Sequence, residues 1–402
     1  MGAGLAGLTL GLALSQRGIK TTIIEKEQLI EPSKWAILLY PQGMKIFDEL
    51  GILEEITSLA MPLKAPEIET TEGEVLVNID VGLLFEKRFN FSLGLGPSEI
   101  RKVLLRHCLT NGVEVMSGVR YVAAIRSPDG GPITGARVSK DGTELTISCS
   151  LLVGADGYNS KVRQDFGGKV VSKGYPPMVA FFIDGEHDLD RFRMRLGDGY
   201  MVVVLPCTKS KLMVAMTERG LLVEQLTGEG GETYVKRRME EAAPFIAGAI
   251  STSQASLADG SMLLIDPQEK WTTAWVVDGG VLIGDAAHSF HPGVGQGAQQ
   301  AFVDAMVLVP TIGDCLSAGD FSERRLASFE RARGPYVRFA KSTFGRLVSM
   351  ETAKGRFGVW LRNRFFRAVN RMYGKRSFQE TAIGQRLPTR WESIRTVLAL
   401  LF

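Results

Sequence analysis

Three glycine-rich segments of the chain carry the residue types that bind nucleotides and their phosphates. The first reads Gly2-Ala-Gly4-Leu-Ala-Gly7, and Glu25 follows it. Glycines permit a tight turn, and they let a pyrophosphate approach the backbone and the N–H groups at the start of a helix. An acidic side chain at the end of the next strand can bind a ribose hydroxyl. The pattern therefore predicts a nucleotide site at Gly2, Gly4, Gly7 and Glu25.

The second segment joins a short apolar strand, 151–153, to a turn that reads Gly-Ala-Asp156-Gly157 and ends at Arg163. Asp156 can accept hydrogen bonds from the amides of the turn, and Arg163 can offer its guanidinium fork to a phosphate. Taken alone, the segment is equally well explained as an ordinary Asp-Gly turn.

The third segment follows a buried strand over 281–283 and leads into a helix from about residue 296. It reads Gly284-Asp285-Ala-Ala-His288-Ser-Phe-His291-Pro292-Gly-Val-Gly295-Gln296-Gly297. Such a loop brings many backbone N–H groups near a flat ligand, and Asp285 can bind a polyol hydroxyl. The pair His288 and His291 lies three residues apart on a loop without a third ligand nearby, which disfavours a metal site.

The elements around these segments predict an α/β fold with a Rossmann-like cofactor domain. An amphipathic helix, ended by Gly18, is expected after the first motif, and a β-branched strand covers 21–25. A strand should also precede Gly2, but only Met1 stands there. The first β-strand is thus missing, and two explanations stay open: a misassigned or truncated start, or a fold without its central strand. The apolar start imitates a signal peptide, but it lacks a basic leading region.

A strand-rich block separates the second and third segments and predicts an inserted β-sheet substrate domain. We expect the cofactor domain to be discontinuous, over 1–60, 96–166 and 276–330. The substrate domain would cover 61–95 and 167–275, and a basic helical region would cover 331–402. The apolar residues expected to wall a substrate chamber facing the third segment are Met178, Phe181, Tyr200, Val202, Val204 and Met213.

The composition of the 402 residues, 45% hydrophobic and 23% charged, is that of a globular protein and excludes disorder, collagen and a disulfide scaffold. The four cysteines form no CxxC pair, which favours buried thiols in a reducing compartment. No run of 18 uncharged apolar residues predicts a transmembrane helix.

The basic charge of the chain is concentrated at its end. Residues 331–402 hold sixteen Lys or Arg and three Glu, a net charge of +13, so the rest of the chain is negative. Arginines alternate with aromatic residues at helical spacing over 336–376, which is typical of a helix on an anionic membrane surface. A helical cap on the substrate domain, with a solvated basic face, explains the same pattern. No nucleic-acid motif accompanies the charge.

Together, the three segments resemble the FAD-dependent aromatic hydroxylases, the single-component flavoprotein monooxygenases typified by para-hydroxybenzoate hydroxylase and the ubiquinone-biosynthesis hydroxylases. The resemblance spans roughly residues 2–335. It implies that the first motif and Glu25 bind the ADP part of FAD, and that Arg101 reaches the cofactor from its helix. It also implies that Asp156-Gly157 serve both FAD and NAD(P)H, that Gly284-Asp285 hold the ribitol–pyrophosphate region, and that the stretch from Pro292 to Gly297, with Gly295 and Gln296, lines the isoalloxazine ring. The family often has Asn where Gln299 stands.

The resemblance further implies the reaction. NAD(P)H, bound transiently, reduces FAD, and O2 then forms a C4a-hydroperoxyflavin that hydroxylates an aromatic or electron-rich lipophilic compound. His291 and Pro292 are the candidate catalytic residues beside the flavin. An olefin epoxidase, a flavin-linked isoprenoid double-bond reductase and a non-catalytic membrane-associated protein with a vestigial flavin fold remain alternatives. We expect a cytoplasmic protein, peripheral at a membrane if the basic helix binds lipid.

Overall fold

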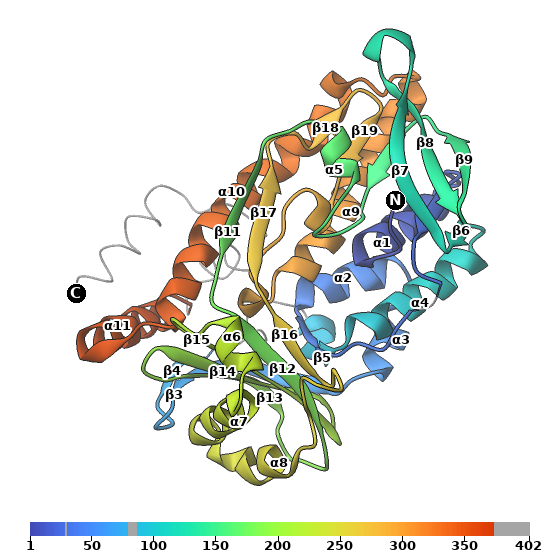
Figure 1. Ribbon diagram of the computed structural model, residues 1–402. Coiled ribbons are helices and arrows are strands. Elements are labelled where there is room, and N and C mark those ends of the chain that lie inside the picture. Colours follow the sequence, from blue (N-terminus) through green and yellow to red (C-terminus); the bar gives the residue numbers. More distant parts are fainter. Residues whose placement is uncertain (29, 79–86, 374–402) are drawn as a thin grey trace.

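The computed structural model of the chain describes residues 1–28, 30–78 and 87–373 (Figure 1). The basic region expected over 331–402 therefore lies within the described residues only as far as residue 373. The part of the expected substrate domain at 79–86 also lies outside them. Helices and strands alternate along the chain, which confirms the predicted α/β class.

The elements have the following bounds. The helices are α1 (Leu5–Ser15), α2 (Pro41–Glu49), α3 (Leu53–Ser58), α4 (Pro97–Thr110), α5 (Val162–Asp165), α6 (Val223–Thr227), α7 (Gly231–Ala242), α8 (Ala247–Thr252), α9 (Gly297–Ala318), α10 (Glu323–Glu351) and α11 (Gly355–Tyr373). The strands are β1 (Thr22–Glu25), β2 (Ile37–Leu39), β3 (Pro62–Thr70), β4 (Val75–Asn78), β5 (Ser92–Leu95), β6 (Glu114–Ser117), β7 (Val119–Arg126), β8 (Ile133–Lys140), β9 (Thr143–Ser148), β10 (Leu152–Gly154), β11 (Val170–Gly174), β12 (Met178–Asp184), β13 (Arg191–Leu196), β14 (Tyr200–Thr208), β15 (Lys211–Glu218), β16 (Met262–Ile265), β17 (Gln268–Thr272), β18 (Val276–Val277) and β19 (Gly280–Leu282).

Two parallel ladders, β1 with β6 and β10 with β19, lie on either side of the first two residues. The N-terminal amine of Met1 donates to the carbonyl of Val153 over 2.7 Å, and the N–H of Ala155 donates to the carbonyl of Met1 over 2.8 Å. On the other side, Gly2 N donates to the carbonyl of Ile24 over 2.7 Å. Residues 1 and 2 therefore connect the two ladders by backbone hydrogen bonds, and the glycine motif begins at the carboxyl ends of the parallel strands.

Helix α1, which we expected to be amphipathic, is instead apolar on all sides because it is enclosed by the rest of the protein. It packs against α4 and α9, and Leu8 and Leu12 are fully buried. Burying a leucine side chain stabilises a fold by about 1.5–3 kcal/mol. This packing holds the start of α1, and with it the glycine turn, in a fixed position.

The substrate-side sheet has nine strands in the order β16-β12-β15-β14-β13-β3-β5-β2, with β4 paired to β3. Helices α6, α7 and α8 cover one of its faces (Figure 1). The antiparallel pair β11 and β17 runs between this sheet and the cofactor-side elements (Figure 1). Side chains alternate between the two faces along each strand, so a shift of one residue decides which face a side chain occupies.

Helix α9 follows the third glycine segment into the core. Within the described part of the chain, it is the helix whose length and composition would allow it to cross a membrane. It packs against α1, α2 and α10, and half of its most apolar stretch is buried, as in the core helix of a globular protein. Helix α10 is continuous across residue 331, with Pro335 inside it. The helical region that we expected to begin at residue 331 therefore begins at Glu323.

Candidate active site

The first glycine motif forms a turn whose glycines have different roles. Gly2 has a positive φ of 102°, and a Cβ there would collide with the carbonyl oxygen of Ala155. A Cβ at Gly7 would collide with the carbonyl oxygen of Gly2. A Cβ at Gly4 would meet only Ala155 O, at 3.9 Å, so the fold itself does not require glycine there. Gly4 caps α1 without a side-chain hydrogen bond, which leaves backbone N–H groups and the positive helix end open to an anionic ligand.

Glu25 and Arg101 both form hydrogen bonds with Ala3, which lies between Gly2 and Gly4. Ala3 donates its N–H to Glu25 Oε2 over 2.7 Å, and Glu27 donates its N–H to Oε1 over 3.0 Å. Arg101, on α4, donates through Nε to the carbonyl of Ala3 over 2.9 Å. Both predicted side chains are half-buried at the turn. The structure thus brings together the first motif, the end of β1 and the helix arginine.

The second motif is organised by Asp156. Its carboxylate accepts hydrogen bonds from the Ser160 hydroxyl and from the N–H groups of Lys161, at 2.7 Å, and Val162, at 3.2 Å. Gly157 has a φ of +77°, a left-handed conformation that favours glycine. Asp156 therefore shapes the turn, as the sequence predicted.

Arg163 differs from its expected role as a phosphate ligand. Its guanidinium group is buried, and it donates to the carbonyl of Ala286 over 2.9 Å, that of Tyr158 over 2.8 Å and that of Asp285 over 3.3 Å. The arginine fork is therefore occupied by carbonyl groups of the second and third segments. It fastens the two loops together.

The third segment leaves β19 through a short 3-10 turn, Gly284–Ala286, and reaches α9 through a second one, Pro292–Val294. Gly284 and Gly295 have positive φ values of 59° and 62°. Asp285 is half-buried, and its Oδ1 lies 3.9 Å from the position of a Cβ at Gly297. Burial raises the pKa of Asp285, and the charges of His288, Lys341 and Arg163 oppose that rise. Asp285 thus lies over the start of α9, beside the loop that runs from Pro292.

A buried ionic network that the sequence analysis missed supports this loop. Asp304, on α9, is fully buried and accepts the Gly284 N–H over 2.8 Å. Arg333 Nε donates to Asp304 Oδ1 over 2.6 Å, and His288 Nε2 lies 2.8 Å from Oδ2. Burial alone would raise the pKa of Asp304, but the charges of His288 and Arg333 hold it below its ordinary value. His288 therefore positions the loop from inside the protein.

His291 is enclosed on the β11–β17 side of the loop. It is 1% exposed, its ring lies 4.5 Å from that of Tyr175, and Nδ1 accepts the Gly293 N–H over 3.0 Å. Burial lowers its pKa to about 4, and the charge of Lys173 adds to the effect. The imidazole is therefore neutral near pH 7. Its Nε2 has no hydrogen-bond partner among the described residues.

In the sequence, Gln299 stands out only as a departure from the family pattern, but its surroundings make it a candidate for cofactor contact. It lies in the first turn of α9 and is 3% exposed. Neither its amide nitrogen nor its amide oxygen has a partner among the described residues. Buried polar groups are nearly always satisfied. A donor and an acceptor held side by side fit the imide edge of a flavin ring.

The structure corrects the expected substrate wall. Phe181, Tyr200 and Val202 belong to the core between the sheet and α6–α8, with Val204. The opposite face carries Met178 and Met213, as expected, together with Met201 and Val203, which were missed. The methyl carbon of Met201 lies 3.5 Å from the position of a Cβ at Gly293, so this face meets the third glycine segment. Because side chains alternate along a strand, an error of one residue reverses the face.

A separate cleft of about 760 Å³ lies between β17 and the face of α10 that is turned toward it. Its lining residues include Glu269, Trp271, Trp275, Lys341 and Ser349. Lys341 donates to the carbonyl of Ser289 over 2.7 Å, and burial lowers its pKa to about 8. This cleft was not predicted, because its residues come from strands and a helix far apart in the sequence.

A family model described as FAD binding domain matches residues 1–341, which is most of the chain. The chain belongs to this family. It is an FAD-dependent monooxygenase of the aromatic hydroxylase group, as the three glycine segments indicated. The resemblance of the three segments to the aromatic hydroxylases is therefore confirmed, whereas several of the side chains expected to wall a substrate chamber, among them Phe181, Tyr200 and Val202, face α6–α8 instead of the third segment.

Relatives match this monooxygenase over nearly its whole length. The 6-methylpretetramide 4-monooxygenase of Streptomyces rimosus is 26% identical over 94% of this chain and 89% of its own length. The 2-heptyl-3-hydroxy-4(1H)-quinolone synthase of Pseudomonas aeruginosa is 27% identical over 96% of this chain and 97% of its own. The crystal structure of p-nitrophenol 4-monooxygenase from Pseudomonas putida superposes with a TM-score of 0.78 at 18% identity, covering 96% of this chain and 98% of that one, and so shares the fold.

Proposed function

We propose that this monooxygenase binds FAD across the three glycine segments and uses NAD(P)H and O2 to hydroxylate an aromatic or electron-rich lipophilic small molecule. The observation that carries the proposal is the convergence of the segments. Ala155 N donates to Met1 O over 2.8 Å, and Arg163 donates to Ala286 O over 2.9 Å, so residues far apart in sequence form one site. FAD supplies the redox chemistry and the activation of oxygen.

The chain's own residues bind and orient the cofactor. The turn at Gly2, Gly4 and Gly7 would take the pyrophosphate on the N–H groups of α1, and Glu25 would take the adenosine ribose. Arg101 holds the turn through Ala3 and adds positive charge beside it. We assign Asp285 to the ribitol region, and the stretch from Pro292 to Gly297, with Gln299, to the flavin ring. Asp156 and Gly157 support both FAD and NAD(P)H use by shaping the turn next to Met1.

The substrate would lie between the third segment and the sheet face that carries Met201, Val203 and Met213. These side chains are 0%, 6% and 5% exposed, and their apolar surface would exclude water from the reacting atoms. Neutral His291 would hold the Gly293 N–H, and with it the loop beside Pro292. In this proposal, residues 1–60, 96–166 and 276–330 form the domain that binds the cofactor. Residues 61–95 and 167–275 form the domain that binds the substrate.

The absorbance spectrum of the purified protein tests the proposal. We expect flavin bands that bleach on anaerobic addition of NADH or NADPH and return on exposure to air. Comparing the two nucleotides identifies the preferred reductant. A protein that stays colourless after incubation with FAD, or a bound flavin that neither nucleotide bleaches, would contradict the proposal.

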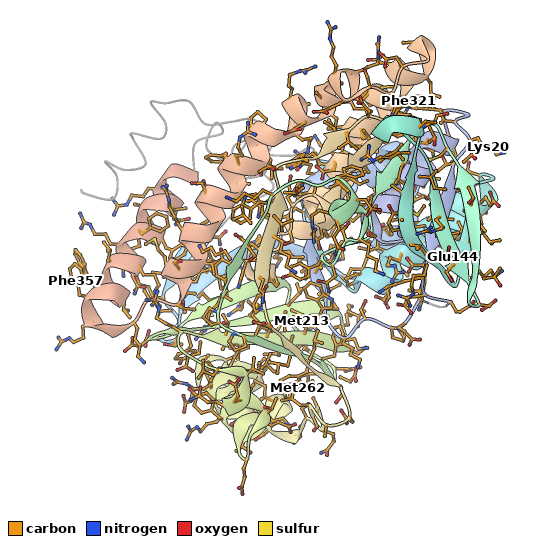
Figure 2. The ribbon with its side chains drawn as sticks, turned by 45° about the horizontal axis from the view of Figure 1, so that its top comes forward. Lys20, Glu144, Met213, Met262, Phe321 and Phe357 are labelled. Carbon is orange, nitrogen blue, oxygen red and sulfur yellow. The ribbon has the colours of Figure 1, made fainter. Side chains whose placement is uncertain are left out.

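A second function, contact with an anionic membrane surface, is favoured by the exposed face of α11. Phe357, Trp360 and Leu361 are 74%, 53% and 40% exposed, and Arg364 lies 5.7 Å from the Trp360 ring. Figure 2 places Phe357 at the outer edge of the molecule, pointing away from its body. The opposite face packs inward through Arg362 and Phe366. Exposed aromatic residues beside arginines are typical of helices that lie in a lipid interface. A helical cap with a solvated face is the alternative.

A further inference from the structure

The buried carboxylate of Glu351 has no role in the site described so far. Glu351 is the last residue of α10 and is 5% exposed. Within residues 1–28, 30–78 and 87–373, its Oε2 has no hydrogen-bond partner, and no Lys, Arg or His forms an ion pair with it. A buried charge without a partner is among the most costly features of a folded protein. Such a group needs either a ligand or a neutral form.

The position of Glu351 is fixed by a hydrogen bond just after the end of α10 and by the packing of the helical turn before it. Gly199, in the turn before β14, donates its N–H to the carbonyl of Ala353 over 2.9 Å, which holds the end of α10 against that turn. Leu347 lies one helical turn before Glu351, on the same face of α10. Leu347 packs against the apolar cluster on the sheet face that carries Met201. Glu351 therefore faces this cluster, and Ser349, on another side of α10, lines the separate cleft.

Tyr40 connects this corner to the third glycine segment. Its ring packs against the same apolar cluster, and its hydroxyl lies 3.3 Å from the position of a Cβ at Gly295. Leu347, one turn before Glu351 on α10, packs against this cluster as well, so Tyr40 and Glu351 border the same apolar region. Burial, and after it the charge of Glu351, raise the pKa of Tyr40 to about 12. Glu351, Tyr40 and Met201 thus border the region where the proposed function places the substrate.

We propose that Glu351, with Tyr40 beside it, is the polar anchor of the substrate, and that it accepts a hydrogen bond from a phenolic O–H or aryl N–H on an otherwise apolar aromatic molecule. This proposal rests on the proposed function and extends it by naming the residue that anchors the substrate. The cluster of Met201, Leu196 and Leu347 would contact the apolar body of the molecule.

The ionisation of Glu351 decides between a neutral and a cationic ligand. Burial raises its pKa to about 8. The carboxyl group is therefore mostly protonated near pH 7, and its carbonyl oxygen accepts from a neutral donor. A hydrogen bond from an O–H or N–H on the ring also leaves that ring electron-rich, as electrophilic hydroxylation requires.

A pair of probes that differ by one donor tests the anchor. We would titrate the FAD-loaded protein with 4-nitrophenol and with 4-nitroanisole at about pH 6, where both are uncharged, and follow the change in flavin absorbance. In the wild type we expect 4-nitrophenol to bind about tenfold more tightly, the worth of one hydrogen bond. Glu351→Leu should remove this preference, and Glu351→Gln, which keeps an amide oxygen acceptor, should restore most of it. Glu323→Leu, an exposed residue in the first turn of the same helix, is the matched control and should leave it unchanged.

Three results would overturn the anchor. One is equal affinity of the wild type for both probes. A wild type that binds neither probe measurably counts as this result. Another is a preference that survives Glu351→Leu. The third is a lowered unfolding temperature of Glu351→Leu, because it would mean that the carboxylate has a structural partner; we expect the temperature to stay level or rise.

The same samples separate this proposal from the proposed function. A yellow wild type that NAD(P)H bleaches but that does not prefer 4-nitrophenol would contradict the anchor alone. A wild type that stays colourless with added FAD would contradict the proposed function, and the anchor with it.

Discussion

The carboxylate of Glu25 accepts a 2.7 Å hydrogen bond from the backbone N–H of Ala3, inside the turn between Gly2 and Gly4. This bond links the end of β1 to the glycine motif. It leaves the remaining acceptor capacity of the carboxylate at the position where an adenosine ribose is expected. Contacts within the chain itself therefore hold this turn.

Alanine substitutions at two glycines should separate folding from cofactor binding. A Cβ at Gly4 has ordinary van der Waals distance to Ala155 O, so Gly4→Ala should fold with an unfolding temperature near that of the wild type. It should lose FAD, because the methyl group occupies the side of the turn open to the pyrophosphate. Gly7→Ala is the contrasting variant and should fail to fold, because its Cβ collides with Gly2 O. Absorbance measures the FAD content of each variant, and thermal unfolding measures its stability. Full FAD content in Gly4→Ala would contradict the assignment.

Removing the carboxylate of Asp285 should weaken FAD binding. Asp285→Ala deletes the acceptor that we assign to the ribitol region, and we expect loss of one charge-assisted hydrogen bond, about 1.5–3 kcal/mol, or roughly tenfold or more in affinity. Asp314→Ala, at an exposed position on α9, should keep its FAD and serves as the control. Titration of the apoprotein with FAD, followed by flavin fluorescence, measures the difference. Equal affinities of the two variants would refute the role of Asp285.

The buried network around Asp304 should matter for stability. Asp304→Asn leaves Arg333 buried opposite a neutral amide, and we expect a loss of about 3–5 kcal/mol in the free energy of unfolding. The exposed pair formed by Arg137 and Glu144, 3.3 Å apart, offers a control. Glu144→Gln should change stability by less than about 1 kcal/mol. Denaturant unfolding of the three proteins makes the comparison, and similar losses in both variants would contradict this account.

The residues of the glycine motifs could be predicted because their roles depend on the backbone. A turn such as that at Gly2 or Gly157 needs a left-handed conformation, and glycine spacing records that need directly in the sequence. Glu25 is the last residue of β1 and Asp285 follows β19, and the carboxyl ends of parallel strands are where nucleotide ligands bind in such folds. This part of the site therefore follows from local rules.

The substrate side could not be predicted in the same way. Tyr200 and Met201 are adjacent and both buried, and only the position of α7 and α8 decides which of them faces the third segment. Glu351 appeared in the sequence as one of three acids in a basic region. Its isolation depends on the packing of α10 against the turn at Gly199, which no local pattern encodes.

The exposed face of α11 predicts salt-sensitive binding to anionic vesicles. Replacing both Phe357 and Trp360 with serine should lower binding to vesicles that contain phosphatidylserine by about tenfold, because two exposed aromatic anchors are lost. Added salt should weaken the binding of the wild type to these vesicles. Leu109→Ser, which changes a 54% exposed residue on α4, is the control. Cosedimentation with vesicles provides the measurement. Unchanged binding in the double variant would favour the helical cap instead.

The raised pKa of Glu351 predicts a pH-dependent stability difference between the wild type and Glu351→Gln. The carboxyl group titrates at about 8 in the folded protein and near 4.5 when unfolded. Between these values the folded state binds more protons, so the stability from this group is present below about pH 4.5 and is lost as the pH rises through about 8. The free energy of unfolding of the wild type should therefore fall relative to the variant by up to about 1.4 kcal/mol per pH unit within that window. Other titrating groups, including Lys341, are common to both proteins and cancel in the comparison. Unfolding in denaturant at pH 5, 6, 7 and 8 measures the difference, and parallel curves would show that Glu351 is charged and has a partner in the folded protein.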